Sequence, residues 1–161
     1  MDVMDVITAL PERNGTRPDA TPAPPQQQLN QISPPHLQEA LFERVKTLPG
    51  IWIGESHISV PGARGFFVED SWAKGPAKAY MIETEFAHLH PDYDGSLHMC
   101  LPEAVAAEVV SKGWGQLHPE VLSGARPPTL IMVYGPRDEE ELEVVWTLMQ
   151  ASHAFGTGES E

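Results

Sequence analysis

Residues 51–101 constrain the fold more than any other part of the chain. This stretch consists of short apolar or alternating runs, separated by the turn-forming pairs Pro61-Gly62, Gly75-Pro76 and Asp94-Gly95. Such runs are typical of strands, and closely spaced turn residues are typical of hairpin connections. We therefore predict an antiparallel meander sheet, with strands near residues 51–59, 65–69, 78–83, 85–91 and 96–101.

Helices are predicted on both sides of this stretch. Apolar residues follow Ser33-Pro34-Pro35 at helical spacing until Pro49-Gly50, and LPEAVAAEVVSKG at 101–113 indicates a second helix. After TLIMVYG, which suits a buried strand, the segment from Pro136 to about Phe155 starts with four acidic residues and continues with an apolar stripe. The chain is therefore predicted to be a single α+β domain, with helices packed on one face of the sheet.

The first 33 residues are predicted to differ from the rest. Residues 3–10 have the apolar spacing of a short docking helix, whereas residues 15–35 are polar and rich in Pro and Gln. A segment of that composition buries too little apolar surface to offset its ordering entropy, so we expect a mobile tether unless it lies along the domain. The expected division is a helix and tether at 1–33, a folded domain at 34–156, and a disordered tail at 157–161.

Charge and composition exclude several classes of partner. Ten Lys and Arg stand against 23 Asp and Glu, and the net charge of −13 disfavours nucleic acid and anionic lipid. No apolar run approaches the roughly 18 residues of a membrane-spanning helix, and the acidic N-terminus is unlike a signal peptide. We expect a cytoplasmic protein without membrane contact. Cys100 is the only cysteine, so neither an internal disulfide nor a thiolate zinc site is expected; the sequence makes no prediction of oligomeric state.

The sequence EFAHLHPDYDGSLHMCLP, residues 85–102, predicts a hairpin with histidines gathered on one face. Side chains alternate along a strand, so the apolar residues at odd positions face the core only if odd positions pair with odd ones. That register places His88 opposite His98 and His90 opposite Ser96. Opposed Cβ atoms lie about 4.5–5.5 Å apart, which is close enough for a shared site.

Three interpretations of this face remain open. The outer face of an antiparallel sheet is commonly solvated, and histidines there need no function. Three imidazoles could instead bind zinc, copper or iron, with Glu85 or Asp94 accepting a hydrogen bond from a ring nitrogen. Without a metal, they could remove a proton from a weakly acidic ligand and hold the anion. We interpret Cys100 as a buried hydrophobic residue rather than a nucleophile. Arg64 and Arg137 could clamp an anion, although Arg137 could equally pair with the carboxylates that follow it.

Three motifs in order give the chain a family resemblance. The hairpin sequence is followed by KGWGQLHP at 112–119 and by YGPRDEEELEVVWTLMQAS at 134–152. Over residues 82–155 this set resembles the luciferase-domain family, which includes the fungal luciferases and many bacterial proteins. For the fungal enzymes the resemblance implies oxygenation of a hydroxylated pyrone by molecular oxygen, without a separate cofactor and with emission of light. Where those enzymes carry an N-terminal hydrophobic anchor, this chain has an acidic segment and a Pro-rich stretch, so membrane attachment is not carried over. Light emission is not carried over either, because it requires a particular luciferin.

The resemblance and the hairpin pattern together give a functional expectation. We expect a cofactor-independent oxygenase that uses molecular oxygen on an enolisable, phenolic or pyrone-like small molecule and holds no metal. The alternatives are a noncatalytic ligand-binding or protein-interaction module and a histidine-ligated metal enzyme. In the expected site His88 or His98 is the base. Arg137 and His118 stabilise the anion, and Trp114 forms an aromatic wall. The expected catalytic residues are His88, His90, His98, His118 and Arg137, and the expected substrate contacts are Glu85, Ser96, Trp114 and Arg64.

Overall fold

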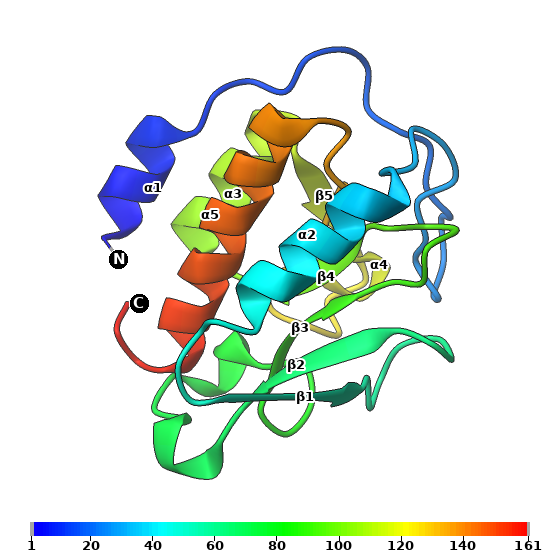
Figure 1. Cartoon of the computed structure of the whole chain (residues 1–161). Coiled ribbons are helices and arrows are strands. Elements are labelled where there is room, and N and C mark those ends of the chain that lie inside the picture. The colour runs from blue at the N-terminus through cyan, green and yellow to red at the C-terminus, as the bar shows by residue number, and fades with distance from the viewer. Residues whose placement is uncertain (1, 161) are drawn as a thin grey trace.

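The computed structural model of the chain describes residues 2–160 and contains one six-stranded sheet with its longer helices on one face (Figure 1). All neighbouring strands are antiparallel, and their order is β1-β2-β3-β4-β6-β5. The predicted α+β class is confirmed. The strands are β1 (Ile51–Glu55), β2 (Arg64–Val68), β3 (Glu85–Leu89), β4 (Leu97–Cys100), β5 (Gly115–Leu117) and β6 (Leu130–Val133).

The helices bury the odd-numbered face of the central hairpin. The longest helix, α5, packs against β3 and β4, and it also contacts α2 and α1. Leu89, Leu97 and Met99 lie in the same core cluster as Val145 and Met149 of α5, as the apolar stripe predicts. The helices are α1 (Val3–Ala9), α2 (Pro35–Val45), α3 (Glu103–Ser111), α4 (Pro119–Leu122) and α5 (Glu139–Gly156), with short 3-10 turns at Asp70–Trp72 and Ala77–Ala79.

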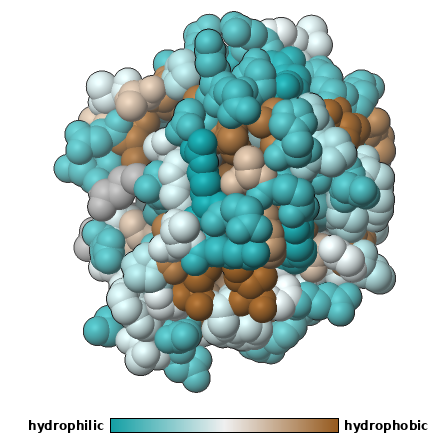
Figure 2. Space-filling model, in the orientation of Figure 1, coloured by the Kyte–Doolittle hydropathy of each residue, from teal (hydrophilic) through white to brown (hydrophobic). Residues whose placement is uncertain are grey.

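The surface in this view is mainly hydrophilic, and its hydrophobic residues form separate small groups (Figure 2). This distribution follows from amphipathic helices that turn their apolar sides toward the sheet. Within residues 2–160, no helix has the length and apolar character needed to cross a membrane.

The N-terminal segment lies along the domain. After α1 the chain runs around the helices to the opposite side of the sheet (Figure 1). Its contacts are mostly polar: the Trp114 indole donates to the Pro11 carbonyl at 2.6 Å, and the Gln28 side-chain oxygen accepts from the Gly135 amide at 3.1 Å. Hydrogen bonds to distant backbone groups thus provide the contacts that its polar composition could not provide by apolar burial.

One detail of the predicted sheet is wrong. Residues 78–83 do not form a strand, because Glu83 adopts a positive φ of 52° and a tight turn leads directly into β3, with a single bridge between Ile82 and Glu85. The meander predicted for residues 51–101 is formed by β1 to β4. Beyond it, β6 pairs with β4, and the three-residue strand β5 lies at the sheet edge.

Candidate functional site

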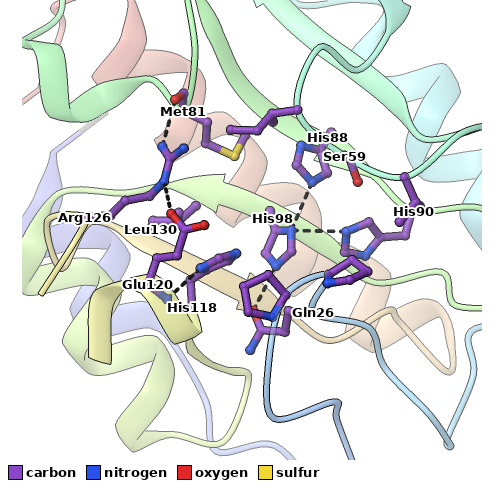
Figure 3. Close-up of a pocket in the computed structure, with 14 residues that line it drawn as sticks. Gln26, Ser59, Met81, His88, His90, His98, His118, Glu120, Arg126 and Leu130 are labelled. Carbon is purple, nitrogen blue, oxygen red and sulfur yellow. Dashed lines mark hydrogen bonds and ion pairs between the residues drawn. The ribbon is translucent and has the colours of Figure 1, made fainter. Parts of the chain in front are cut away.

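The predicted register of the histidine hairpin is confirmed. His88 pairs with His98 and Leu89 with Leu97 across β3 and β4, and the His90 amide donates to the Ser96 carbonyl at 2.9 Å. Alternation along the strands therefore turns all three imidazoles to the side away from the helices. Figure 3 shows the rings converging on one point beside a pocket.

The cluster is buried, so its interpretation as a solvated face is wrong. His88 and His90 are each 2% exposed and His98 is 5% exposed. Residues 24–26 of the N-terminal segment and residues 58–60, which follow β1, line the pocket beside them. Burial lowers the pKa of His88 to about 4 and lowers the pKa of His98 well below its usual value, so both rings are neutral near pH 7.

Glu85 orients the first ring. Its buried carboxylate accepts from the Ser56 hydroxyl at 2.7 Å and from the His57 amide at 2.9 Å, and it lies 2.8 Å from His88 Nδ1. Burial would raise the pKa of Glu85, but the hydrogen bonds from His88 and Ser56 lower it below its usual value. An ionised carboxylate can only accept, so the proton of neutral His88 is on Nδ1 and its Nε2 carries a lone pair.

Ser96 and Asp94 orient the second ring in the same way. The Ser96 hydroxyl donates to Asp94 Oδ1 at 2.5 Å, so its oxygen is left to accept from His90 Nδ1 at 2.9 Å. Burial raises the pKa of Asp94, but hydrogen bonding from His90 outweighs that effect and the net pKa is lowered. His90 therefore uses its Nδ1 for this contact and turns its Nε2 toward the cluster.

Gln26 orients the third ring. Its side-chain nitrogen donates to the Leu117 carbonyl at 3.3 Å, which turns its oxygen toward His98 Nε2 at 2.9 Å. The proton of His98 is therefore on Nε2, and its Nδ1 is unprotonated. That Nδ1 lies 3.0 Å from His88 Nε2 and 3.1 Å from His90 Nε2, so three ring nitrogens meet at one point.

The pocket beside the cluster has one polar wall. Its cavity volume is about 90 Å³, and Met81 and Leu130 contribute apolar surface. The Arg126 guanidinium donates to Glu120 at 2.8 Å and to the Met81 carbonyl at 2.8 Å. His118 Nδ1 accepts from the Glu120 amide at 3.0 Å, so the neutral ring has its proton on Nε2 and acts as a donor. Burial lowers the pKa of His118, which favours this neutral form.

The structure brings together six of the nine residues expected at the site and places three elsewhere. Arg64 forms an ion pair with Glu39 at 2.8 Å and lies over the Phe42 ring, toward the helices. Trp114 belongs to the main hydrophobic core, and Arg137 is paired with a carboxylate in the first turn of α5. The six that meet at or directly behind the cluster are His88, His90, His98, His118, Glu85 and Ser96.

Three residues of the site were not among those expected. Arg126 and Glu120 form the polar wall, and Gln26 contacts the cluster from the N-terminal segment. Glu120 directly follows the KGWGQLHP motif, and this position could have identified it from the sequence. Nothing in the spacing of Arg126 or Gln26 marks them, because both are brought to the site by loops.

The fold and the site define an α+β domain with a buried histidine cluster beside a small pocket, and comparison with known proteins shows which family it resembles. Residues 83–152 match the family model "Luciferase domain". The resemblance drawn from the motifs is thus confirmed. None of the solved structures matches the chain significantly.

Several curated relatives are fungal luciferases. The chain is 34% identical to a luciferase of Armillaria gallica over 93% of its own length and 62% of that protein. It is 35% identical to a luciferase of Armillaria mellea with the same coverage, and 30% identical to one of Neonothopanus nambi over 95% of this chain and 63% of that protein. The chain therefore spans less than two thirds of the length of these relatives.

Proposed function

We propose that this protein is a small-molecule oxygenase that acts with molecular oxygen on an enolic, phenolic or pyrone-like substrate. The observation that supports this most is the convergence of three imidazole nitrogens beside a partly apolar pocket. The similarity to proteins named luciferases is consistent with oxygen chemistry.

The chemistry that the site favours begins with an anion. A substrate oxygen placed against the cluster loses its proton to a lone pair, or to solvent if a cation held by the rings binds that oxygen. The resulting enolate carbon supplies both electrons of the new bond to molecular oxygen, and the peroxide formed takes up a proton. His118 and Arg126 line the same pocket and would donate hydrogen bonds to the anion, the role expected of His118 and Arg137 from the sequence.

The second candidate is a noncatalytic ligand-binding module, and in either case the size of the cavity limits the ligand. Pockets for drug-sized ligands usually occupy roughly 300–1,000 Å³. The cavity beside the histidines has about 90 Å³, so a bicyclic or styryl-substituted pyrone would not fit without movement of its walls. Pro24 and Pro25 line it, and they belong to a segment without regular secondary structure.

Oxygen consumption tests the proposal directly. The full chain would be incubated with a panel of hydroxypyrones, acidic phenols and β-diketones, with dissolved oxygen and substrate absorbance followed together. We expect stoichiometric consumption of oxygen with at least one substrate and a loss of at least 100-fold in His98→Ala. Arg64→Ala is the matched control, because Arg64 lies toward the helices.

Two outcomes would count against the oxygenase. If a compound raises the unfolding temperature of the wild-type chain, loses this effect with His98→Ala and consumes no oxygen, the binding module is the better description. Equal turnover in the wild-type chain and His98→Ala would contradict a role for the cluster in the chemistry.

A further inference from the structure

The three imidazoles each turn one ring nitrogen toward a common point. His98 Nδ1 lies 3.0 Å from His88 Nε2 and 3.1 Å from His90 Nε2, and the other nitrogen of each ring is held by an outer partner. Lone pairs that face each other at a hydrogen-bond distance repel, so a positive atom must lie between them. That atom is either a shared proton or a metal ion.

Two buried carboxyl groups lie directly behind the cluster. Glu85 and Asp94 are both 0% exposed, and within residues 2–160 the only basic side chains within ion-pair distance of them are His88, at 2.8 Å, and His90, at 3.3 Å. These carboxyl groups are placed to compensate the charge of a cation held among the ring nitrogens.

The outer partners form the arrangement that orients metal-ligating histidines. Imidazoles that bind metals usually donate their second N–H to a carboxylate, a carbonyl or water. Here the acceptors are the Glu85 carboxylate, the Ser96 hydroxyl in front of Asp94, and the Gln26 amide oxygen. Asp94 Oδ2 is also 3.3 Å from His90 Nδ1 and is the buried side-chain oxygen that has no hydrogen-bond partner among the described residues.

From these observations we propose that His88, His90 and His98 bind one divalent first-row transition-metal ion, zinc(II) or iron(II). The ligand nitrogens lie within 4.8 Å of one another, and the two measured separations are a few tenths of an ångström below the roughly 3.4 Å set by tetrahedral bonds of 2.0–2.1 Å. Three neutral nitrogen ligands suit these ions and not magnesium or calcium, which prefer oxygen.

The site leaves coordination positions toward the pocket. All three ligands line that pocket, and so do His118 and Arg126. His118 is not a fourth ligand through Nδ1, because that atom accepts from the Glu120 amide. A substrate oxygen that enters the pocket would therefore meet the metal. This inference reverses the metal-free expectation drawn from the family resemblance, and it goes beyond the proposed function because it requires no substrate.

Metal analysis of the full chain, purified without a histidine tag, tests the site. We expect one equivalent of zinc or iron per chain, and uptake of one equivalent of cobalt(II) by chelator-treated protein, with the visible absorption of nitrogen-coordinated cobalt. His90→Ala should weaken cobalt affinity at least 100-fold. Glu85→Gln keeps every ligand and should weaken it about 10- to 100-fold.

His153→Gln is the matched control. His153 is also 5% exposed, but its Nε2 donates to the Pro49 carbonyl at 2.8 Å. Its substitution should leave cobalt binding unchanged. Circular dichroism of each variant separates loss of a ligand from loss of the fold. If folded wild-type protein neither retains metal nor takes up cobalt(II), the cluster holds a shared proton and the proposal is wrong.

The metal site and the proposed function fail separately. One equivalent of bound metal without oxygen consumption on any substrate would support the site and count against the oxygenase. Full oxygenase activity in metal-free, chelator-treated protein would overturn the metal site and leave the oxygenase intact.

Discussion

The single thiol of the chain is unreactive in the folded state. Cys100 is 2% exposed, and burial raises its pKa to about 12. Thiols react as thiolates, so we expect no reaction of native protein with a disulfide reagent such as DTNB at pH 8, and release of one equivalent after unfolding in guanidinium. Rapid labelling of the native protein would contradict the burial of this strand and would restore Cys100 as a candidate nucleophile.

The individual residues of the site were predictable only where strand alternation fixes them. His88, His90, His98 and Ser96 follow from one register, because a slip by one residue would turn Leu89 and Leu97 to the wrong face. Gln26 and Arg126 follow from no local pattern, since one lies in a polar segment and the other in a loop after α4. Arg137 is followed directly by acidic residues, and in the structure its side chain pairs with one of them, Glu141, instead of reaching the pocket.

The start of α5 depends on an ion pair that should weaken as the pH falls. Glu141 lies 3.0 Å from Arg137 Nε and also accepts from the Arg137 amide at 2.9 Å. Burial would raise the pKa of Glu141, but these hydrogen bonds lower it. A lowered folded-state pKa stabilises the protein above the unfolded pKa, and this stabilisation disappears as pH falls through the folded pKa.

Glu141→Gln should therefore lower the free energy of unfolding by about 1–2 kcal/mol at pH 7. Urea unfolding at pH 7 and pH 3.5 measures this, and the difference from wild type should shrink at the lower pH. Glu140→Gln removes a charge from the same helical turn at an exposed position, so it should change the free energy by less than about 0.5 kcal/mol. An equal effect of both variants would assign the stabilisation to the helix dipole instead of the ion pair.

At the level of whole elements, long periodic patterns were sufficient to predict a helix or strand from the sequence, and short segments were not. The long apolar stripe of α5 and the alternating hairpin were both found from sequence, because several residues report the same period. The strand β5 has three residues and α4 has four, which is too few to show any period. The apolar residues near Met81 suggested a strand, but a positive φ at Glu83 turns the chain before a ladder can form.

On the scale of the whole molecule, the N-terminal segment decides whether the histidines are surface or interior. Without residues 24–26 the hairpin would present an outer sheet face, which is what the sequence suggested as one interpretation. Composition could not reveal the docking, because the contacts are hydrogen bonds between glutamine side chains and backbone groups up to 107 residues away in sequence. A ligand larger than the cavity of about 90 Å³ requires this segment to move.

Gln28 is the residue whose loss should release that segment. Its side-chain oxygen accepts from the Gly135 amide, and its nitrogen donates to the carbonyls of Asn30 and Gln31 at 3.0 Å each. Gln28→Ala should raise amide hydrogen exchange across residues 19–30 at least tenfold and leave exchange in α5 unchanged, because the segment opens locally without global unfolding. The control is Gln27→Ala, whose side chain is half-buried and makes no hydrogen bond among the described residues. The same exchange in both variants would show that packing of the prolines, not the Gln28 hydrogen bonds, holds the N-terminal segment against the histidines.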